Sequence, residues 1–417
     1  MTQTSASISD RVYVWAWLPD ASEPTPVGLL LRRDGTGLSF HYGERYLDRR
    51  GAVSLYGPLL PLRDEWFEPT GDLGMPGVLR DGAPDGWGRR VILNRLTGTR
   101  GMDADVAQLD ELTYLLNSGS NRFGAIDFQA SPVEYVPRNE AASLDDLHEA
   151  ALLVEAGELL PIGLSDALLG GSTIGGARPK ALIDDGDQQW IAKFSTSSDL
   201  YSVVGAEAAS IELARRAGID VPDSKVMRSL DRDVLLTRRF DRPGGGRRRM
   251  VISALTMLGL DETEARYGSY TALVEVFRQF GNQPSAAARD LFQRIAFNIA
   301  ISNTDDHLRN HAAFWDGRHI DLTPAYDLSP MNRSGETATQ AIAYGSSGER
   351  GSNFASLLGV CHEYGLAAPA ARTIIDGVIS AVQDGWDDAA DLARLTSIDK
   401  GLLWGRQFLN PGTTHGY

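Results

Sequence analysis

The sequence predicts an α+β fold with a β-rich N-terminal part and a mainly helical C-terminal part. Short strand-like runs separated by turn signals dominate residues 11–65, and apolar residues at helical spacing dominate the chain beyond residue 250. A length of 417 residues also exceeds what one hydrophobic core usually serves. We therefore expect three domains or lobes, at residues 1–150, 151–242 and 243–417.

The bulk composition is typical of a soluble globular protein, with 42% hydrophobic and 23% charged residues. The single cysteine, Cys361, excludes an intramolecular disulfide and favours a reducing compartment, so we expect a cytoplasmic protein. No segment has the ~18 consecutive apolar residues of a membrane span, and the polar start from Met1 to Arg11 is unlike a signal peptide. The net charge of −15 argues against a general nucleic-acid binder, because neutralising phosphates requires an excess of Lys and Arg.

The N-terminal residues divide into strands followed by helices. Alternating apolar residues bounded by turns predict three strands, at Val12–Trp17, Val27–Arg32 and Leu38–Tyr42. From Pro84 the pattern becomes helical, with helices expected over Val91–Leu96 and Val106–Leu116. The polar stretch from Ala130 to Asp145 has the composition of a linker or long loop, which places the first domain boundary near residue 150.

The middle of the chain predicts a hairpin, a helix and a further strand, over Lys180–Asp184 with Gln188–Phe194, Val203–Ala217 and Val234–Phe240. Asp185-Gly186 suits the hairpin turn, and Gly218 suits the helix end because glycine readily adopts a left-handed conformation. A basic run from Arg242 to Arg249 follows. We interpret this run as a solvated hairpin tip, with a contact to operator DNA or substrate as the alternative.

A glycine-rich segment from Gly170 to Lys180 precedes the hairpin. Consecutive glycines let backbone N–H groups turn toward one anion, so such a loop can hold phosphate. The segment is not a Walker A loop, because Ala181 follows the lysine where Ser or Thr should hold Mg²⁺. Taken alone, the signal is weak, and a surface turn without a ligand is the commoner meaning.

Lys193 and Glu207 form a candidate ion pair. Strand alternation places Lys193 on the face opposite Ala192 and Phe194, and helical spacing places Glu207 on the apolar stripe of the following helix. A carboxylate on an apolar stripe needs a cation, and protein kinases use such a strand-lysine and helix-glutamate pair to hold ATP phosphates. The alternative is that Glu207 lies at the edge of the stripe and reaches solvent.

The strongest motif follows an amphipathic helix near residues 291–299. Asp305 and Asn310 have the D-x-x-x-x-N spacing of a kinase catalytic loop, in which the aspartate orients the attacking hydroxyl and the asparagine binds Mg²⁺. Asp327 follows a predicted hairpin turned at Asp316-Gly317, which is where a second metal-binding aspartate is expected.

Each motif also has a purely structural explanation. Residues 303–306 can cap a helix, His307 can be a structural hydrogen-bonding group, and the Asp-x₄-Asn spacing is common by chance. However, the glycine-rich loop, Lys193, Glu207, the catalytic-loop pair and Asp327 occur in kinase order on the expected elements. Because five independent coincidences are a poor alternative, we interpret the chain as an ATP- and Mg²⁺-dependent phosphotransferase with a protein-kinase-like fold.

Four segments together carry a family resemblance: Pro84 to Arg89, Gly175 to Lys180, Arg239 to Arg242, and Thr304 to Asn310 followed by Leu322 to Asp327. In that order they resemble the N-terminal motif, the phosphate loop, the hinge segment, and the catalytic and metal loops of the HipA family of bacterial serine/threonine kinase toxins. The resemblance covers nearly the whole chain. It implies a two-lobed, protein-kinase-like fold of the HipA type with an extra β-rich N-terminal domain.

The resemblance implies a role for each matching residue. Asp305 would be the catalytic aspartate, and Asn310 and Asp327 would hold Mg²⁺. In this family a serine just before the phosphate loop is autophosphorylated, which ejects the loop and switches the kinase off; here either Ser172 or Thr173 can be that site. The residues implied to line the ATP site are Gly175, Gly176, Ala177, Arg178, Lys180, Lys193, Glu207, Arg238, Arg239, Phe240, His307, Arg309, Asn310, Tyr326 and Asp327.

Two residues depart from the family's best-known members, and the resemblance implies that they tune the chemistry without abolishing it. Asp306 stands where a glycine is common, and Arg238 replaces an acidic hinge residue. The chain also has neither the His-Arg-Asp nor the Asp-Phe-Gly motif, which argues against an ordinary eukaryotic-type kinase.

The resemblance also implies partners. Such toxins are neutralised by a small helix-turn-helix antitoxin (HipB-like), and the pair represses its own operon, so operator DNA is expected only through that complex. The acidic net charge fits a basic partner. Family precedents phosphorylate a protein substrate such as an aminoacyl-tRNA synthetase. Two other functions stay open, namely a small-molecule phosphotransferase and a catalytically silent co-repressor module.

Overall fold

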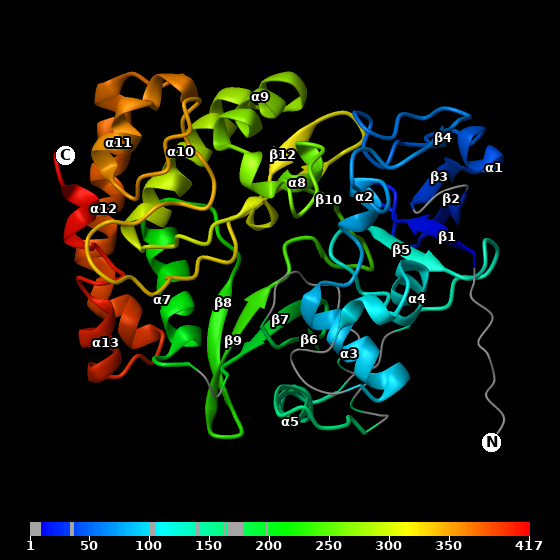
Figure 1. Ribbon diagram of the computed structural model, residues 1–417, viewed down its shortest axis with the longest axis horizontal. Helices are drawn as coiled ribbons and strands as arrows, with labels where there is room; N and C mark the ends of the chain where they lie inside the picture. The colour runs from blue at the N-terminus through cyan, green and yellow to red at the C-terminus, as the bar shows by residue number, and fades with distance from the viewer. Residues whose placement is uncertain are drawn as a thin grey trace. The chain divides into compact units, whose positions relative to one another are not determined.

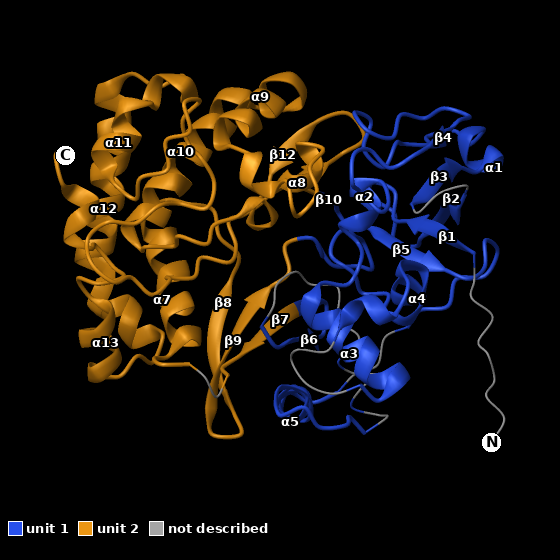
Figure 2. Cartoon of the chain, in the orientation of Figure 1, with its two compact units in different colours: residues 1–189, 241–251 blue, residues 190–240, 252–417 orange. Residues whose placement is uncertain are grey.

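The computed structural model describes residues 10–33, 37–99, 105–138, 142–161, 164, 168, 178–196 and 199–417. The chain divides into two compact units (Figure 2). The first comprises residues 1–189 and 241–251, and the second comprises residues 190–240 and 252–417. The chain therefore leaves the first unit after Gln189 and returns to it for residues 241–251. The three-part division at residues 150 and 242 stays a prediction.

An antiparallel sheet of five strands lies in the first unit, in the order β4-β3-β2-β1-β5 (Figure 1). The strands are β1 (Arg11–Ala16), β2 (Thr25–Arg32), β3 (Leu38–Tyr42), β4 (Trp66–Phe67) and β5 (Ile126–Gln129). Apolar side chains from alternate positions, such as Val12, Val14 and Phe40, are fully buried, which is what strand alternation requires. The three predicted strands are confirmed with nearly their predicted bounds.

The helices of the first unit are α1 (Glu44–Leu47), α2 (Gly77–Arg80), α3 (Gly86–Thr97), the 3-10 helix η1 (Val106–Gln108), α4 (Glu111–Asn117) and α5 (Leu144–Glu155). The carboxylate of Asp85 caps α3 by accepting a hydrogen bond from the Gly88 amide at 2.7 Å. The single helix predicted over 106–116 is wrong, because Asp110 accepts hydrogen bonds from the Leu112 and Thr113 amides and so starts a separate helix.

A buried carboxylate, Asp127 on β5, organises the end of this sheet. It accepts hydrogen bonds from Arg122 at 2.7 Å, Arg138 at 3.0 Å and the Tyr135 hydroxyl at 2.9 Å. Burial alone would raise the pKa of Asp127, but the attraction of Arg122 and Arg138 outweighs burial and lowers it below its usual value. Residues 131–138 have no helix or strand, as a linker would, but Tyr135 and Arg138 anchor them to the sheet.

The basic run from Arg242 to Arg249 is anchored at both ends. The Arg242 guanidinium is buried and donates to the Gly124 carbonyl at 2.9 Å and to the Asp241 carboxylate at 2.7 Å. The Arg248 guanidinium lies 3.4 Å from the ring centroid of Trp17. The interpretation as a solvated tip is therefore wrong for these two arginines, although Gly245, Gly246 and Arg247 between them are exposed.

The sheet of the second unit positions the candidate site. Strand β7 (Gln188–Phe194), from Trp190 onward, pairs antiparallel with β9 (Arg232–Arg238), which in turn pairs antiparallel with β8 (Ser224–Ser229). Helix α7 (Val203–Arg216) packs against β8 and β9. The strand β6 (Lys180–Asp185) belongs to the first unit, and Gly186 after it has a positive φ of 63°, as a tight turn requires.

The rest of the second unit is mainly helical, as predicted. Its helices are α8 (Ala254–Met257), η2 (Ala265–Tyr267), α9 (Tyr270–Phe280), α10 (Pro284–Ala300), η3 (Leu308–Asn310), α11 (Phe354–Gly359), η4 (Cys361–Tyr364), α12 (Ala368–Leu392), α13 (Ser397–Leu403) and η5 (Pro411–Thr414). Helix α10 packs against α9 and α12, and α12 packs against α7.

Three short strands complete the fold: β10 (Met250–Ser253), β11 (Ala312–Trp315) and β12 (Ile320–Leu322). Strands β11 and β12 pair antiparallel, which confirms the hairpin predicted around Asp316-Gly317. In the part of the chain that the structure describes, no helix combines the length and apolarity needed to cross a bilayer.

Candidate functional site

Lys193 lies at the centre of the candidate site, between two carboxylates. Its ammonium nitrogen is 2.6 Å from a carboxylate oxygen of Glu207 and 2.5 Å from one of Asp327. The three residues come from β7, from α7 and from the segment after β12 (Figure 1). Burial alone would lower the pKa of Lys193, but Asp327 and Glu207 outweigh burial and raise it above its usual value. Lys193 is therefore a cation throughout the physiological pH range.

The local sequence explains how Lys193 and Glu207 meet. Trp190, Ala192 and Phe194 are buried on one face of β7, so Lys193 projects from the other face. Glu207 is only 4% exposed, on the stripe of α7 that also buries Val204. The predicted ion pair is thus confirmed, and the alternative of a solvent-exposed Glu207 is wrong.

Asp327 sits on an unusual backbone. Its φ is +60°, in the left-handed region that side chains other than glycine, asparagine and aspartate seldom adopt. The side-chain amide of Asn303 bonds the side chain of Asn298 at 3.0 Å and lies 3.5 Å from the Asp327 carbonyl, at the limit of a hydrogen bond. The end of α10 and the segment carrying Asp327 are therefore neighbours.

The two adjacent aspartates after α10 have opposite environments. The chain turns at Ser302, which has a positive φ of 53°, and then exposes Asp305 while burying Asp306 to 4%. Only Asp305 is open to a substrate. Residues 303–306 do not cap a helix, because the helix that follows, η3, begins at Leu308 with His307 as its N-cap residue and has no side-chain cap, so the purely structural explanation is wrong here.

The segments that carry Asn310 and Asp327 are tied together. The Tyr326 hydroxyl, one residue before Asp327, donates to the backbone carbonyl of Arg309 at 2.7 Å. Within the other segment, the backbone N–H of Asn310 donates to the backbone carbonyl of His307 at 2.8 Å. An amide oxygen and a carboxylate are hard oxygen ligands of the kind that Mg²⁺ takes together with phosphate oxygens and water. The donor chemistry of Asn310 and Asp327 therefore fits this cation. Among the described residues no group of three or more His, Cys, Asp or Glu side chains could form a metal site by itself.

The predicted adenine-pocket residues divide into an aromatic part and a charged part. The ring of Phe240 packs against Tyr326 at 5.7 Å and against Phe314 at 5.8 Å between centroids. Arg239 is buried, whereas Arg238 at the end of β9 reaches Asp223 at 3.2 Å. The aromatic contact brings Phe240 beside the residue that precedes Asp327.

Other predicted site residues have surroundings of their own or lie outside the described residues. Arg309 pairs with Glu262, and Lys180 is buried in the first unit with its ammonium 3.3 Å from Asp85. Arg178 is exposed. The loop residues Ser172, Thr173, Gly175, Gly176 and Ala177 lie outside the described residues. Nucleotide contacts by all of these residues, and by His307, stay predictions.

Sequence reasoning missed two side chains next to the catalytic-loop segment. Tyr270 at the start of α9 and His311 before β11 are both buried against Asp306. Burial, and then the neighbouring Asp306 carboxylate, raises the pKa of Tyr270 well above its usual value, so its hydroxyl stays protonated. No local pattern distinguishes either residue from an ordinary core aromatic.

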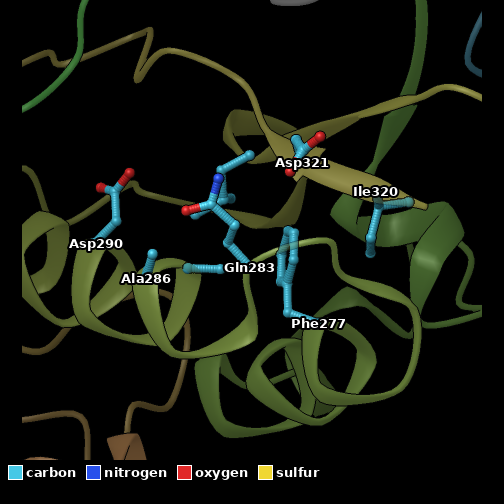
Figure 3. Close-up of a pocket in the computed structure, with 8 residues that line it drawn as sticks. Phe277, Gln283, Ala286, Asp290, Ile320 and Asp321 are labelled. Carbon is cyan, nitrogen blue, oxygen red and sulfur yellow. The ribbon is translucent and has the colours of Figure 1, made fainter.

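A pocket of about 170 Å³ lies between α9, α10 and β12 and holds none of the predicted site residues (Figure 3). Phe277, Ile320 and Ala286 form its apolar part, and Gln283, Asp290 and Asp321 its polar part. The Asp290 carboxylate is already paired with Arg294 at 2.8 Å.

Known proteins resemble both halves of the chain. A family model described as the HipA-like C-terminal domain matches residues 172–386, and a HipA N-terminal domain model matches residues 18–129. The Toxin YjjJ of Escherichia coli (strain K12) is 24% identical over 296 residues. That match covers 64% of this chain and 61% of the relative, so the chain spans less than two thirds of that protein's length.

Solved structures show the fold. The HipA chain in the complex of HipA, HipB and operator DNA from Shewanella oneidensis MR-1 aligns with a TM-score of 0.65 at 19% identity, covering 94% of both chains. This likeness confirms the predicted α+β fold of the HipA type. The Helicobacter pylori proinflammatory kinase CtkA aligns with 53% of this chain at a TM-score of only 0.36 and 9% identity.

Proposed function

Because the chain belongs to the HipA family, we propose that it is an ATP- and Mg²⁺-dependent protein serine/threonine kinase and the toxin of a toxin–antitoxin pair. The observation that carries the proposal is the contact of Lys193 with both Glu207 and Asp327. Protein kinases require the same lysine–glutamate pair and the same metal-binding aspartate. The exposed carboxylate of Asp305 supplies the remaining role.

Each residue then has a part in phosphate transfer. Asp305 accepts or orients the proton of the attacking hydroxyl. Asn310 and Asp327 would hold Mg²⁺, which neutralises charge on the phosphates. With Mg²⁺ bound, Asp327 would pair with the cation in place of Lys193, and the Lys193 ammonium, held by Glu207, would be available to phosphate oxygens. The aromatic rings of Phe240 and Tyr326 provide an apolar surface for the nucleotide base.

The partners belong to the same proposal. The name of the E. coli relative supports a toxin, and the complex that contains the Shewanella HipA supports a HipB-like helix-turn-helix antitoxin. Operator DNA would be bound through that antitoxin, since the net charge of −15 suits a basic partner better than a phosphate backbone. The protein substrate would be a translation component such as an aminoacyl-tRNA synthetase, and Ser172 or Thr173 would be the site of self-inactivation.

Replacing Asp305 with asparagine should lower the rate of phosphate transfer at least about a hundredfold, because the variant keeps the shape but loses the proton acceptor. The measurement is intact mass with peptide mapping after incubation with MgATP. The native chain should gain about 80 Da per phosphate on the peptide with Ser172 and Thr173, and the variant should not.

Asp321→Asn provides a matched control, since it removes a carboxylate of the same unit that lines the separate pocket between α9, α10 and β12. It should transfer phosphate at the native rate. A native rate in Asp305→Asn would contradict the proposal. ATP turnover on a small acceptor without any mass gain would favour a small-molecule phosphotransferase, and an absence of ATP binding in calorimetry would favour the silent co-repressor.

A further inference from the structure

Asp306, the residue that follows the exposed Asp305, is the centre of a buried polar cluster. Its carboxylate accepts hydrogen bonds from the Tyr270 hydroxyl and from Nε2 of His311, the latter at 2.9 and 3.0 Å. The Tyr270 oxygen and His311 Nε2 are themselves 3.0 Å apart. Tyr270, Asp306 and His311 are 1%, 4% and 3% exposed, so no substrate can reach them. We call these three residues the Asp306 cluster.

The Asp306 cluster joins the catalytic-loop segment, residues 303–311, to helices α8 and α9. This segment is called the loop below. Tyr270 is the first residue of α9, and its own amide donates to the Ala343 carbonyl at 2.9 Å. The His311 carbonyl accepts a hydrogen bond from the Ala254 amide, at the start of α8, at 2.8 Å. The loop therefore cannot shift without disturbing α8 or α9.

The hydrogen bonds between Asp306 and His311 close a ring of six residues. The residue before this ring is Asp305, and the residue before its last member is Asn310. Inside the ring the backbone N–H of Asn310 donates to the His307 carbonyl at 2.8 Å, which further restricts the conformation of the loop. A buried carboxylate is costly to leave without donors, so the two donors hold Asp306 in one place.

We propose that Tyr270, Asp306 and His311 are positioning residues for phosphate transfer, which hold Asp305 and Asn310 at a fixed separation on a loop that is otherwise irregular. The inference rests on the proposed kinase function. Asp306 is then not a second catalytic aspartate, although it is next to Asp305 in the chain. Its carboxylate acts only through the backbone it anchors.

Tyr270→Phe and His311→Leu each remove one donor and should lower kcat for MgATP-dependent transfer roughly tenfold to a hundredfold, because small displacements of a reacting group cost that much. The KM for ATP should stay within about twofold, since most of the residues proposed to bind the nucleotide lie outside residues 303–311. His311→Gln should restore most of kcat, because the glutamine amide nitrogen can take the place of Nε2 and donate to Asp306.

The control variant is Tyr364→Phe. It removes an equally buried hydroxyl in the same unit, one that donates to the Tyr344 carbonyl at 2.6 Å and not to the loop. It should lower Tm about as much as Tyr270→Phe does, because each loses one buried hydrogen bond, and should leave kcat unchanged. A purely structural role of the cluster would instead give both tyrosine variants the same kcat.

Three outcomes decide the inference. A tenfold or larger fall in kcat for Tyr270→Phe and His311→Leu, with recovery in His311→Gln, supports it. Native kcat in folded Tyr270→Phe and His311→Leu overturns it. If the native chain transfers no phosphate, the proposed function fails separately, and hydrogen exchange then tests the cluster: amides of residues 303–311 should exchange faster in Tyr270→Phe than in Tyr364→Phe, and equal rates overturn the inference.

Discussion

Replacing Lys193 with methionine is expected to lower phosphate transfer roughly a hundredfold to a thousandfold, the loss typical for one preorganised group that stabilises transition-state charge. The change also leaves Glu207, 6% exposed at its side chain, without its cation. Breaking a buried ion pair on one side destabilises by about 3–5 kcal/mol. Transfer is measured with MgATP, and the free energy of unfolding by denaturant titration.

A double variant separates these two effects. Lys193→Met combined with Glu207→Leu removes both charges from the buried contact, so most of the lost stability should return, since apolar replacements of a buried pair are often neutral. Phosphate transfer should not return, because the lysine proposed to bind the phosphates is still absent. Recovery of transfer in the double variant would show that Lys193 serves only to stabilise the unit.

The pKa of Lys193 predicts how this stabilisation depends on pH. Because the pKa in the folded protein is raised above the unfolded value of about 10.4, the contribution is fully present below that value and is lost as the pH rises through the folded pKa. The difference in unfolding free energy between the native chain and Lys193→Met should therefore stay constant from neutral pH to about pH 9.

Asp127→Asn should destabilise the first unit by about 3–5 kcal/mol, because Arg122, whose side chain is completely buried, loses the charge that compensates it. The asparagine also gives Arg138 and the Tyr135 hydroxyl a weaker acceptor. Denaturant unfolding measures the effect. The native contribution of Asp127 is present above its unfolded pKa of about 3.9 and is lost as the pH falls through its lowered folded pKa.

The matched control for this variant is Asp64→Asn in the same unit. Asp64 pairs with His41 at 3.1 Å, but its side chain is 76% exposed, and solvent screens such a pair. The unfolding free energy of Asp64→Asn should therefore hardly differ from that of the native chain. If Asp127→Asn unfolded no more easily than Asp64→Asn, the buried cluster around Asp127 would not be the anchor that the geometry indicates.

Local sequence patterns predicted most of the secondary structure. Strand alternation located β1, β2, β3, β7 and β9, and helical spacing located α7 and α10. The break between η1 and α4 was missed because Asp110 can cap a helix inside an apolar pattern that reads as continuous. The anchoring of residues 131–138 was missed because Arg138 and Tyr135 bond Asp127, and such distant contacts leave no local periodicity.

The candidate site was predictable only in part. The pair Lys193 and Glu207 followed from which faces of β7 and α7 are apolar. The third member, Asp327, was expected as a metal ligand, but its contact with Lys193 spans 134 positions and follows only from the folded chain. The sequence could not show that Asp306 is buried, because that depends on the approach of Tyr270 from α9, 36 positions earlier in the chain.

The path of the chain between the two units limits how the protein can be dissected. A fragment that ends at Gln189 lacks residues 241–251, which complete the first unit. It would lose Arg242, whose guanidinium bonds the side chain of Asn121 and the Gly124 carbonyl. No single cut releases both units whole, and a truncation after Val251 that preserves the first unit still carries residues 190–240 of the second unit between the two pieces of the first.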